Sequence, residues 1–138
     1  MRRYLFLIVF IIFSVTGWAK GKDGYVVATS EAVRADAAWM KVVDALVKKH
    51  KADVIFYKEN IGELQKPLRQ LRPRFVAFVE KPEFLNREYV MEGHRMSRRV
   101  DEDIYADYLW GIITGFSAED AMRLVDRSRE PFLIRTAL

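Results

Sequence analysis

Short apolar runs alternate with amphipathic stretches along this chain, and the alternation constrains its fold more than any other feature. The runs are rich in β-branched and aromatic residues, as buried strands are. They lie at Gly24–Thr29, Asp53–Tyr57, Phe75–Val79 and Leu109–Thr114, with a candidate fifth at Phe132–Arg135. Strands that alternate with helices predict an α/β fold, with a mostly parallel sheet of four or five strands and helices on both faces.

The stretches between these runs carry helical signals. Between Ala37 and Lys51, apolar residues recur at the i, i+3, i+4 spacing of one helix face. The other predicted helices are Gln65–Leu71, Leu85–Val100 and a last one that opens at Ser117 and runs to about Arg127. We find no internal repeat and no interdomain linker, so residues 20–138 are expected to form a single domain.

The first 19 residues have the order of a secretory signal. Arg2 and Arg3 precede the apolar run Tyr4–Phe13, and Gly17 and Ala19 fit a small-residue cleavage site before Lys20. The apolar part is shorter than the ~20 residues of a spanning helix, which favours cleavage over an uncleaved membrane anchor or a buried core helix. We therefore expect an exported protein in the periplasm, the cell envelope or the extracellular space, with a bacterial source favoured. Contact with a membrane is expected only through an uncleaved signal.

The chain contains no cysteine and two histidines. This composition excludes disulfides and a thiol nucleophile, and it makes a structural zinc site improbable. The formal net charge is +4, of which Arg2 and Arg3 would leave with the signal. The remaining balance gives no argument for binding nucleic acid. No Gly-rich phosphate loop and no Gly-x-Ser-x-Gly elbow is present.

Polar residues stand at the carboxyl ends of the predicted strands, where open α/β sheets bind their ligands. These residues are Thr29, Ser30 and Glu31; Lys58, Glu59 and Asn60; Glu80 and Lys81; and Thr114 and Gly115. From this set we select Thr29, Ser30, Glu59, Asn60 and Thr114 as candidate ligand-binding residues. The alternative is that they are ordinary caps and turns.

Two further groups have a functional and a structural interpretation. His50, on the apolar stripe of the first helix, is interpreted as a capping or partly buried residue rather than a catalytic base. His94 stands among Arg87, Arg95, Arg98 and Arg99. That cluster could bind an anion or an acidic partner, but a solvated helix face is the favoured interpretation.

An acidic segment precedes the fourth predicted strand. Asp101, Asp103 and Asp107 offer the carboxylate oxygens that calcium prefers, although Ala106 stands where an EF-hand loop has glycine. Calcium is the only cofactor that the sequence suggests. The alternative is local pairing of these carboxylates with Arg98 and Arg99.

The segment Tyr105–Ala121 (YADYLWGIITGFSAEDA) resembles part of the gingipain-like cysteine peptidases. There an acidic, aromatic loop leads into a strand ending in Gly-Arg, followed by a small-residue turn and a helix. Phe75–Val79 is similar to the preceding core strand of that caspase-like fold. The resemblance implies caspase-like or flavodoxin-like layering, with the catalytic histidine and cysteine beyond the reach of this chain. Phe116 replaces the family's arginine.

The resemblance therefore implies an exported, non-catalytic domain, matching the N-terminal part of such a peptidase and truncated or degenerate. Its partner would be a missing C-terminal half or another protein. The apolar ending Phe132–Leu138 is open to two interpretations, a truncation or a genuine short last strand. The alternative functions are a small ligand- or protein-binding module of the cell envelope and a signal-anchored membrane protein.

Overall fold

Four parallel strands form the centre of the structure, a computed structural model that describes residues 24–127. The elements in chain order are β1 (Tyr25–Ser30), α1 (Glu31–Arg34), α2 (Ala37–His50), β2 (Asp53–Tyr57), η1 (Ile61–Leu64), α3 (Gln65–Leu71), β3 (Phe75–Val79), η2 (Pro82–Phe84), α4 (Arg87–Met96), β4 (Leu109–Ile113) and α5 (Ala118–Arg127). The predicted α/β class and parallel sheet are confirmed. The predicted signal at 1–19 and the candidate strand Phe132–Arg135 lie outside the described residues.

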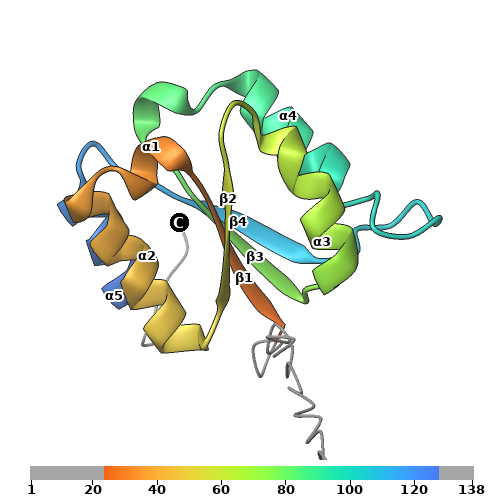
Figure 1. The fold of residues 1–138 in the computed structure, drawn as a ribbon, viewed down its shortest axis with the longest axis horizontal. Coiled ribbons are helices and arrows are strands. Elements are labelled where there is room, and N and C mark those ends of the chain that lie inside the picture. The colour runs from red at the N-terminus through yellow and green to blue at the C-terminus, as the bar shows by residue number, and fades with distance from the viewer. Residues whose placement is uncertain (1–23, 128–138) are drawn as a thin grey trace, which may run out of the picture.

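The strand order is β2-β1-β3-β4. The chain first crosses from β1 to β2 on one side, and the next crossover brings β3 to the other side of β1. Figure 1 shows α1, α2 and α5 over one face of the sheet and α3 and α4 over the other. Such a reversal is a topological switch point, and it places a crevice at the carboxyl ends of β1 and β3.

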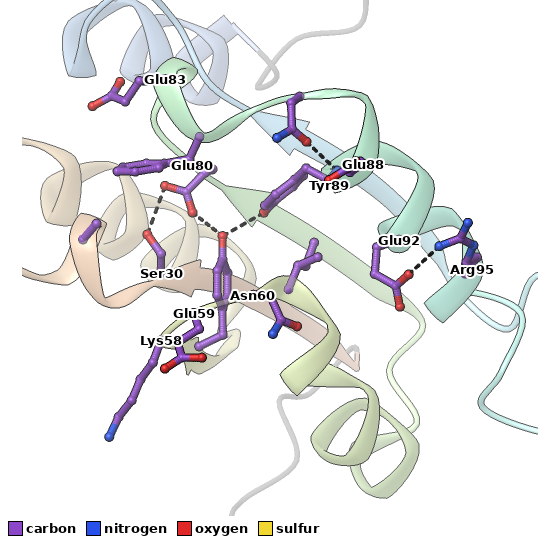
Figure 2. Close-up of a pocket in the computed structure, with 15 residues that line it drawn as sticks. Ser30, Lys58, Glu59, Asn60, Glu80, Glu83, Glu88, Tyr89, Glu92 and Arg95 are labelled. Atoms are coloured by element: carbon purple, nitrogen blue, oxygen red, sulfur yellow. Dashed lines mark hydrogen bonds and ion pairs between the residues drawn. The ribbon is translucent and has the colours of Figure 1, made fainter.

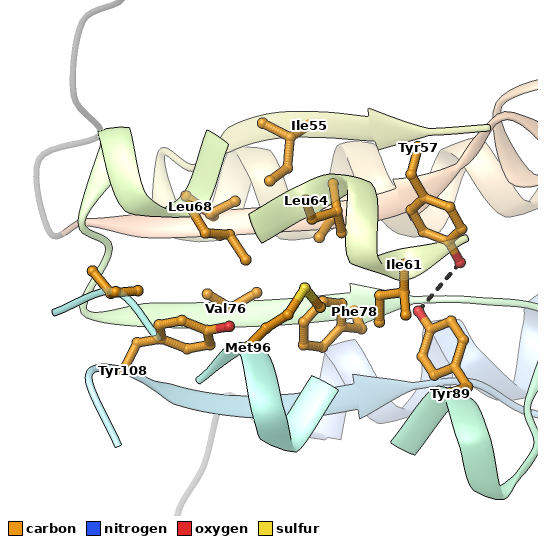
Figure 3. Close-up of a cluster of buried hydrophobic side chains, with 13 residues drawn as sticks. Ile55, Tyr57, Ile61, Leu64, Leu68, Val76, Phe78, Tyr89, Met96 and Tyr108 are labelled. Atoms are coloured by element: carbon orange, nitrogen blue, oxygen red, sulfur yellow. Dashed lines mark hydrogen bonds between the residues drawn. The ribbon is translucent and has the colours of Figure 1, made fainter. Parts of the chain in front are cut away.

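Each face of the sheet packs against its own set of helices, because successive strand residues point to opposite faces. On the side of α2 and α5, Val27, Ala77 and Val79 pack with Val43 and Ala121. The cluster on the side of α3 and α4, which Figure 3 shows, is built from larger side chains. Its members include Val76, Phe78, Leu64, Leu68 and Met96. Among residues 24–127, no helix is both long enough and apolar enough to cross a bilayer.

The helix predicted at Leu85–Val100 is shorter in the structure, where α4 covers Arg87–Met96. Asn86 begins it, because its side-chain oxygen accepts the Tyr89 N–H at 2.8 Å. The Ser97 hydroxyl donates to the His94 carbonyl at 2.8 Å, beside the end of the helix. Val100 is buried as its apolar character suggested, but it lies in the following loop, where its N–H donates to Asp107.

Gly115 sits in the tight turn between β4 and α5. A Cβ atom at this position would lie 2.6 Å from the Asp120 Cβ and 2.9 Å from the Ala121 nitrogen, closer than real contacts allow. After the turn, the Asp120 N–H donates to the Ser117 hydroxyl oxygen at 3.4 Å, which matches the predicted helix cap. The glycine therefore allows α5 to fold back directly onto the sheet.

Candidate functional site

A pocket of about 760 Å³ opens at the carboxyl ends of β1, β2 and β3, on the side of α4. We call it the strand-end pocket. Its lining residues are Ser30, Ala32, Tyr57, Lys58, Glu59, Asn60, Ile61, Glu80, Glu83, Phe84, Asn86, Glu88, Tyr89, Glu92 and Arg95. The volume lies in the range of small-molecule sites, and the location is the one that the switch point predicts.

The inner wall of the pocket is a hydrogen-bonded group centred on Glu80, the residue directly after β3. Its side chain is 0% exposed. One carboxylate oxygen accepts the Ser30 hydroxyl at 3.0 Å and the Lys81 N–H at 2.9 Å. The other accepts the Tyr57 hydroxyl, so three donors from the ends of three strands meet on one carboxylate. Figure 2 shows the bond between Ser30 and Glu80. These donors replace the water that a buried carboxylate loses.

The same group extends outward through two tyrosines. The Tyr57 and Tyr89 hydroxyl oxygens are 3.3 Å apart, and because Tyr57 donates its proton to Glu80, Tyr89 donates to Tyr57. Burial raises the pKa of both phenols far above the ordinary value, and for Tyr57 the Tyr89 and Glu80 side chains add to the shift. Both hydroxyls therefore stay protonated across the physiological range and serve as fixed donors.

The rim of the pocket is acidic. Five glutamates line the pocket, Glu80 in its inner wall and four on the rim, against the two cationic side chains of Lys58 and Arg95. Arg95 is already paired with Glu92, with its Nη1 atom 3.0 Å from the carboxylate. Within residues 24–127, Glu59, Glu83 and Glu88 form no ion pair. The rim thus offers three carboxylates that form no ion pair with the described residues, although Lys81 interacts electrostatically with Glu83.

A turn stabilised by Glu63 positions the rim residues that follow β2. The Glu63 carboxylate accepts the backbone N–H groups of Lys58, Glu59 and Asn60, at 3.1, 2.8 and 3.1 Å. These bonds favour the charged form and lower the pKa of the Glu63 carboxyl below its usual value. The conformation of this rim segment therefore depends on an ionised Glu63.

This dependence predicts an effect of acid on the rim. A carboxyl group whose pKa is lower in the folded than in the unfolded state stabilises the turn fully when the pH is above its unfolded-state pKa. The contribution is lost as the pH falls through its folded-state pKa. We expect the amide NMR resonances of Lys58, Glu59 and Asn60 to shift together below the usual glutamate range. In Glu63→Gln this shared titration should disappear, whereas Glu102→Gln should leave it unchanged. Resonances that still titrate together in Glu63→Gln contradict the assignment.

The candidate residues selected from the sequence divide into two groups. Ser30, Glu59 and Asn60 line the strand-end pocket. Thr29 does not, because it points to the opposite face of the sheet from Ser30, and its hydroxyl donates to the Val79 carbonyl at 2.7 Å. Thr114 follows β4 at the sheet edge, and its hydroxyl oxygen is buried with no hydrogen-bond partner among the described residues.

Tyr57, Tyr89 and Glu80 were not selected from the sequence. The two tyrosines lie in the predicted strand Asp53–Tyr57 and the predicted helix Leu85–Val100, and their hydroxyl partners come from other elements. The sequence could have indicated Glu80, because it is a carboxylate directly after a continuous apolar strand. Ser30 has a similar position, since it is a hydroxyl at the end of another strand. A polar group at such a place needs a partner, and neighbouring strand ends supply it.

The acidic loop brings its three aspartates together. One carboxylate oxygen from each of Asp101, Asp103 and Asp107 lies within 4.8 Å of the others. The predicted pairing with Arg98 and Arg99 is wrong for the described residues, which show no such ion pair. The carboxylates accept backbone N–H groups instead: those of Asp103, Tyr105 and Val100. The loop thus satisfies its own backbone, and the calcium site stays a prediction.

The two histidines lie outside the pocket. His50, the last residue of α2, is half-buried, and its ring stacks on Tyr25 with centroids 4.1 Å apart. His94 is exposed on α4, as are Arg87 and Arg95, which fits a solvated helix face. Arg98 and Arg99 are exposed as well but lie in the loop after the helix.

Comparison with protein-family models, with curated proteins and with solved structures gives no match. The segment Tyr105–Ala121, which carries the resemblance to gingipain-like peptidases, spans part of the acidic loop, β4 and the start of α5. That relationship stays a prediction.

Proposed function

We propose that this chain is an exported α/β domain that binds a small, positively charged ligand in the strand-end pocket. The observation that carries the proposal is the acidic rim at the switch point, where Glu59, Glu83 and Glu88 form no ion pair with the described residues. Each of these carboxylates lines the pocket that a cation would enter. A cleft lined by charges of one sign also concentrates counter-ions and steers them inward.

The shape of the pocket adds a preference for an organic cation. Phe84 is half-exposed at the rim and offers an apolar surface, and Asn60 and Asn86 are polar neighbours. A ligand that carries a primary amine or a guanidinium group on a short carbon chain suits this combination of carboxylates, amides and an aromatic ring. Its amine would donate hydrogen bonds to the glutamates of the rim.

Binding suits this site better than catalysis. A general base must reach the proton that it removes. Glu80, the most buried carboxylate of the pocket, is 0% exposed and accepts three hydrogen bonds from protein groups. Its geometry is that of a fixed wall. Among residues 24–127, Glu59, Glu83 and Glu88 have no hydrogen-bonded side-chain partner of the kind that orients an activated base.

Thermal unfolding of the full chain tests the proposal with cadaverine, a diamine. A ligand that binds only the folded state adds about 2.7 kcal/mol of stability at about 100 times its Kd. We expect the midpoint to rise with cadaverine but not with pentanediol, its neutral counterpart, or with glutarate, its anionic one. The rise should be lost in Glu83→Gln/Glu88→Gln and kept in Glu102→Gln, which removes a charge outside the pocket. An equal rise in both variants, or none with any amine, overturns the proposal.

A further inference from the structure

The amino ends of the strands carry basic residues, at the opposite end of the sheet from the strand-end pocket. Lys51 precedes β2, and Arg72 and Arg74 precede β3, with β1 between these two strands. All three residues are exposed. The exposed side of α3 continues this surface with Lys66 and Arg69. We call these five residues the basic face.

The charges of the basic face are not paired within the described part of the chain. None of the five residues forms an ion pair with another of residues 24–127. The reason lies in the sequence, because residues 65–79 include four basic residues and no acidic one. At this end of the sheet, Asp53 is half-buried, and Asp126 lies on α5, which covers the opposite face from α3 (Figure 1). A surface of one charge sign attracts partners of the other sign.

Two of these cations occupy backbone positions that normally favour glycine. Lys51 caps the end of α2 with a φ of 50°, and Arg72 caps the end of α3 with a φ of 44°. They are the two non-glycine residues with positive φ among those that the structure describes. A Cβ atom disfavours this left-handed conformation, and the helix dipole offsets only part of the cost for a cation. Such conformations are concentrated at functional sites.

The described chain begins at the same end of the sheet. The carbonyl of Gly24, the first described residue, accepts the Arg74 N–H at 2.7 Å and the Phe75 N–H at 3.1 Å. In the sequence, the apolar run Tyr4–Phe13 stands shortly before Gly24. An uncleaved signal would therefore tether the domain to a bilayer by the end that carries the basic face. An apolar anchor combined with a basic patch is a common arrangement for holding a protein against an anionic membrane.

We propose that the basic face docks on the headgroups of a bilayer that contains anionic lipid. Arg69, Arg72 and Arg74 donate hydrogen bonds to the lipid phosphates, because the planar guanidinium group matches two phosphate oxygens at once. The strand-end pocket, at the carboxyl ends of the same strands, then opens away from the bilayer toward soluble ligands. The docking depends on charge at the amino ends and is independent of the ligand proposed for the pocket.

Paramagnetic relaxation by a gadolinium-labelled lipid tests this orientation by NMR. The full chain is added to labelled nanodiscs of phosphatidylcholine, with and without phosphatidylglycerol, and the neutral nanodiscs measure the relaxation that a tether alone causes. We expect the amide signals of Lys51, Arg72 and Arg74 to broaden further in the anionic nanodiscs. The signals of Asn60 and Asn86, which line the pocket, should stay sharp in both.

Removing charge from the basic face should reverse the docking. Each basic residue near an anionic surface strengthens binding about fivefold, so Arg69→Gln/Arg72→Gln/Arg74→Gln should shift the equilibrium about a hundredfold toward the undocked state and remove most of the additional broadening. Raising the salt concentration should act in the same direction, because it screens exposed charges.

Two further variants control for the number of charges and for the fold. Lys41→Gln/Arg87→Gln/Arg123→Gln removes the same charge from other exposed positions and should keep the broadening. Replacing the three arginines of the basic face by lysine keeps the charge and should retain most of it.

Three results overturn the proposal. They are equal broadening in neutral and anionic nanodiscs, equal loss in the two glutamine variants, and no broadening in either kind of nanodisc. In the last case, shifts of the same amide signals on addition of polyphosphate would assign the basic face to a soluble polyanion.

Discussion

Replacing Glu80 by alanine is expected to destabilise the domain by about 3–5 kcal/mol, the range for removing one member of a buried charged network. The substitution removes the acceptor of the Ser30 hydroxyl, the Tyr57 hydroxyl and the Lys81 N–H together. Each donor left buried without a partner costs about 1–3 kcal/mol. Urea unfolding of the purified chain, followed by circular dichroism, measures the loss.

Glu80→Gln is the matched control, because it keeps the volume and one acceptor oxygen but replaces the other with an amide donor. Its cost should be clearly smaller than that of Glu80→Ala. If the free energy of unfolding of Glu80→Ala lies within about 0.5 kcal/mol of that of the unmodified chain, as is usual for a surface substitution, the three strand ends are not held by this carboxylate.

Phe78→Ala should cost a similar amount, about 3–5 kcal/mol, through the cavity that it leaves. Phe78 is fully buried in the middle of β3, and its ring meets Tyr89 and Trp110 edge to face, at centroid distances of 6.3 and 5.7 Å. Such aromatic pairs add to the free energy of burial. Urea unfolding measures the change in stability, and tryptophan emission should shift to longer wavelength as Trp110 loses its packing partner.

Phe116→Ala removes the same side chain from a position that is 100% exposed. Its effect should stay within about 0.5 kcal/mol. Equal losses for the two alanine variants would show that Phe78 is not the centre of the core that Figure 3 draws.

The strands could be located from the sequence because they are runs of apolar residues. β1 and β3 are buried on both faces, whereas no residue of β4 is fully buried. Their apolar runs are continuous, so each was recognised within a residue of its observed end. The order of the strands, with β1 between β2 and β3, needs long-range pairing that no local pattern contains. The end of α4 was missed for a related reason, since Val100 is apolar and buried but is held by Asp107 from outside the helix.

The pocket was predictable in its place and only partly in its residues. Parallel strands bring their carboxyl ends to one edge, which is why Ser30, Glu59 and Asn60 meet there. Successive side chains of a strand point to opposite faces of the sheet, so Ser30 lines the pocket and Thr29, one residue earlier, does not. The role of Tyr57 depends on Glu80, 23 residues later, so it could be seen only once the strands were paired.

The central position of β1 has a consequence for the order in which the chain can fold. Its two neighbours come later in the sequence, and the Thr29 hydroxyl meets the Val79 carbonyl across a separation of 50 residues. Any nascent fragment that ends before Phe75 leaves one edge of β1 open, and closing loops of this length slows folding. Synthesis must therefore proceed past β3 before the sheet can form, and until then β1 lacks one of its two partners.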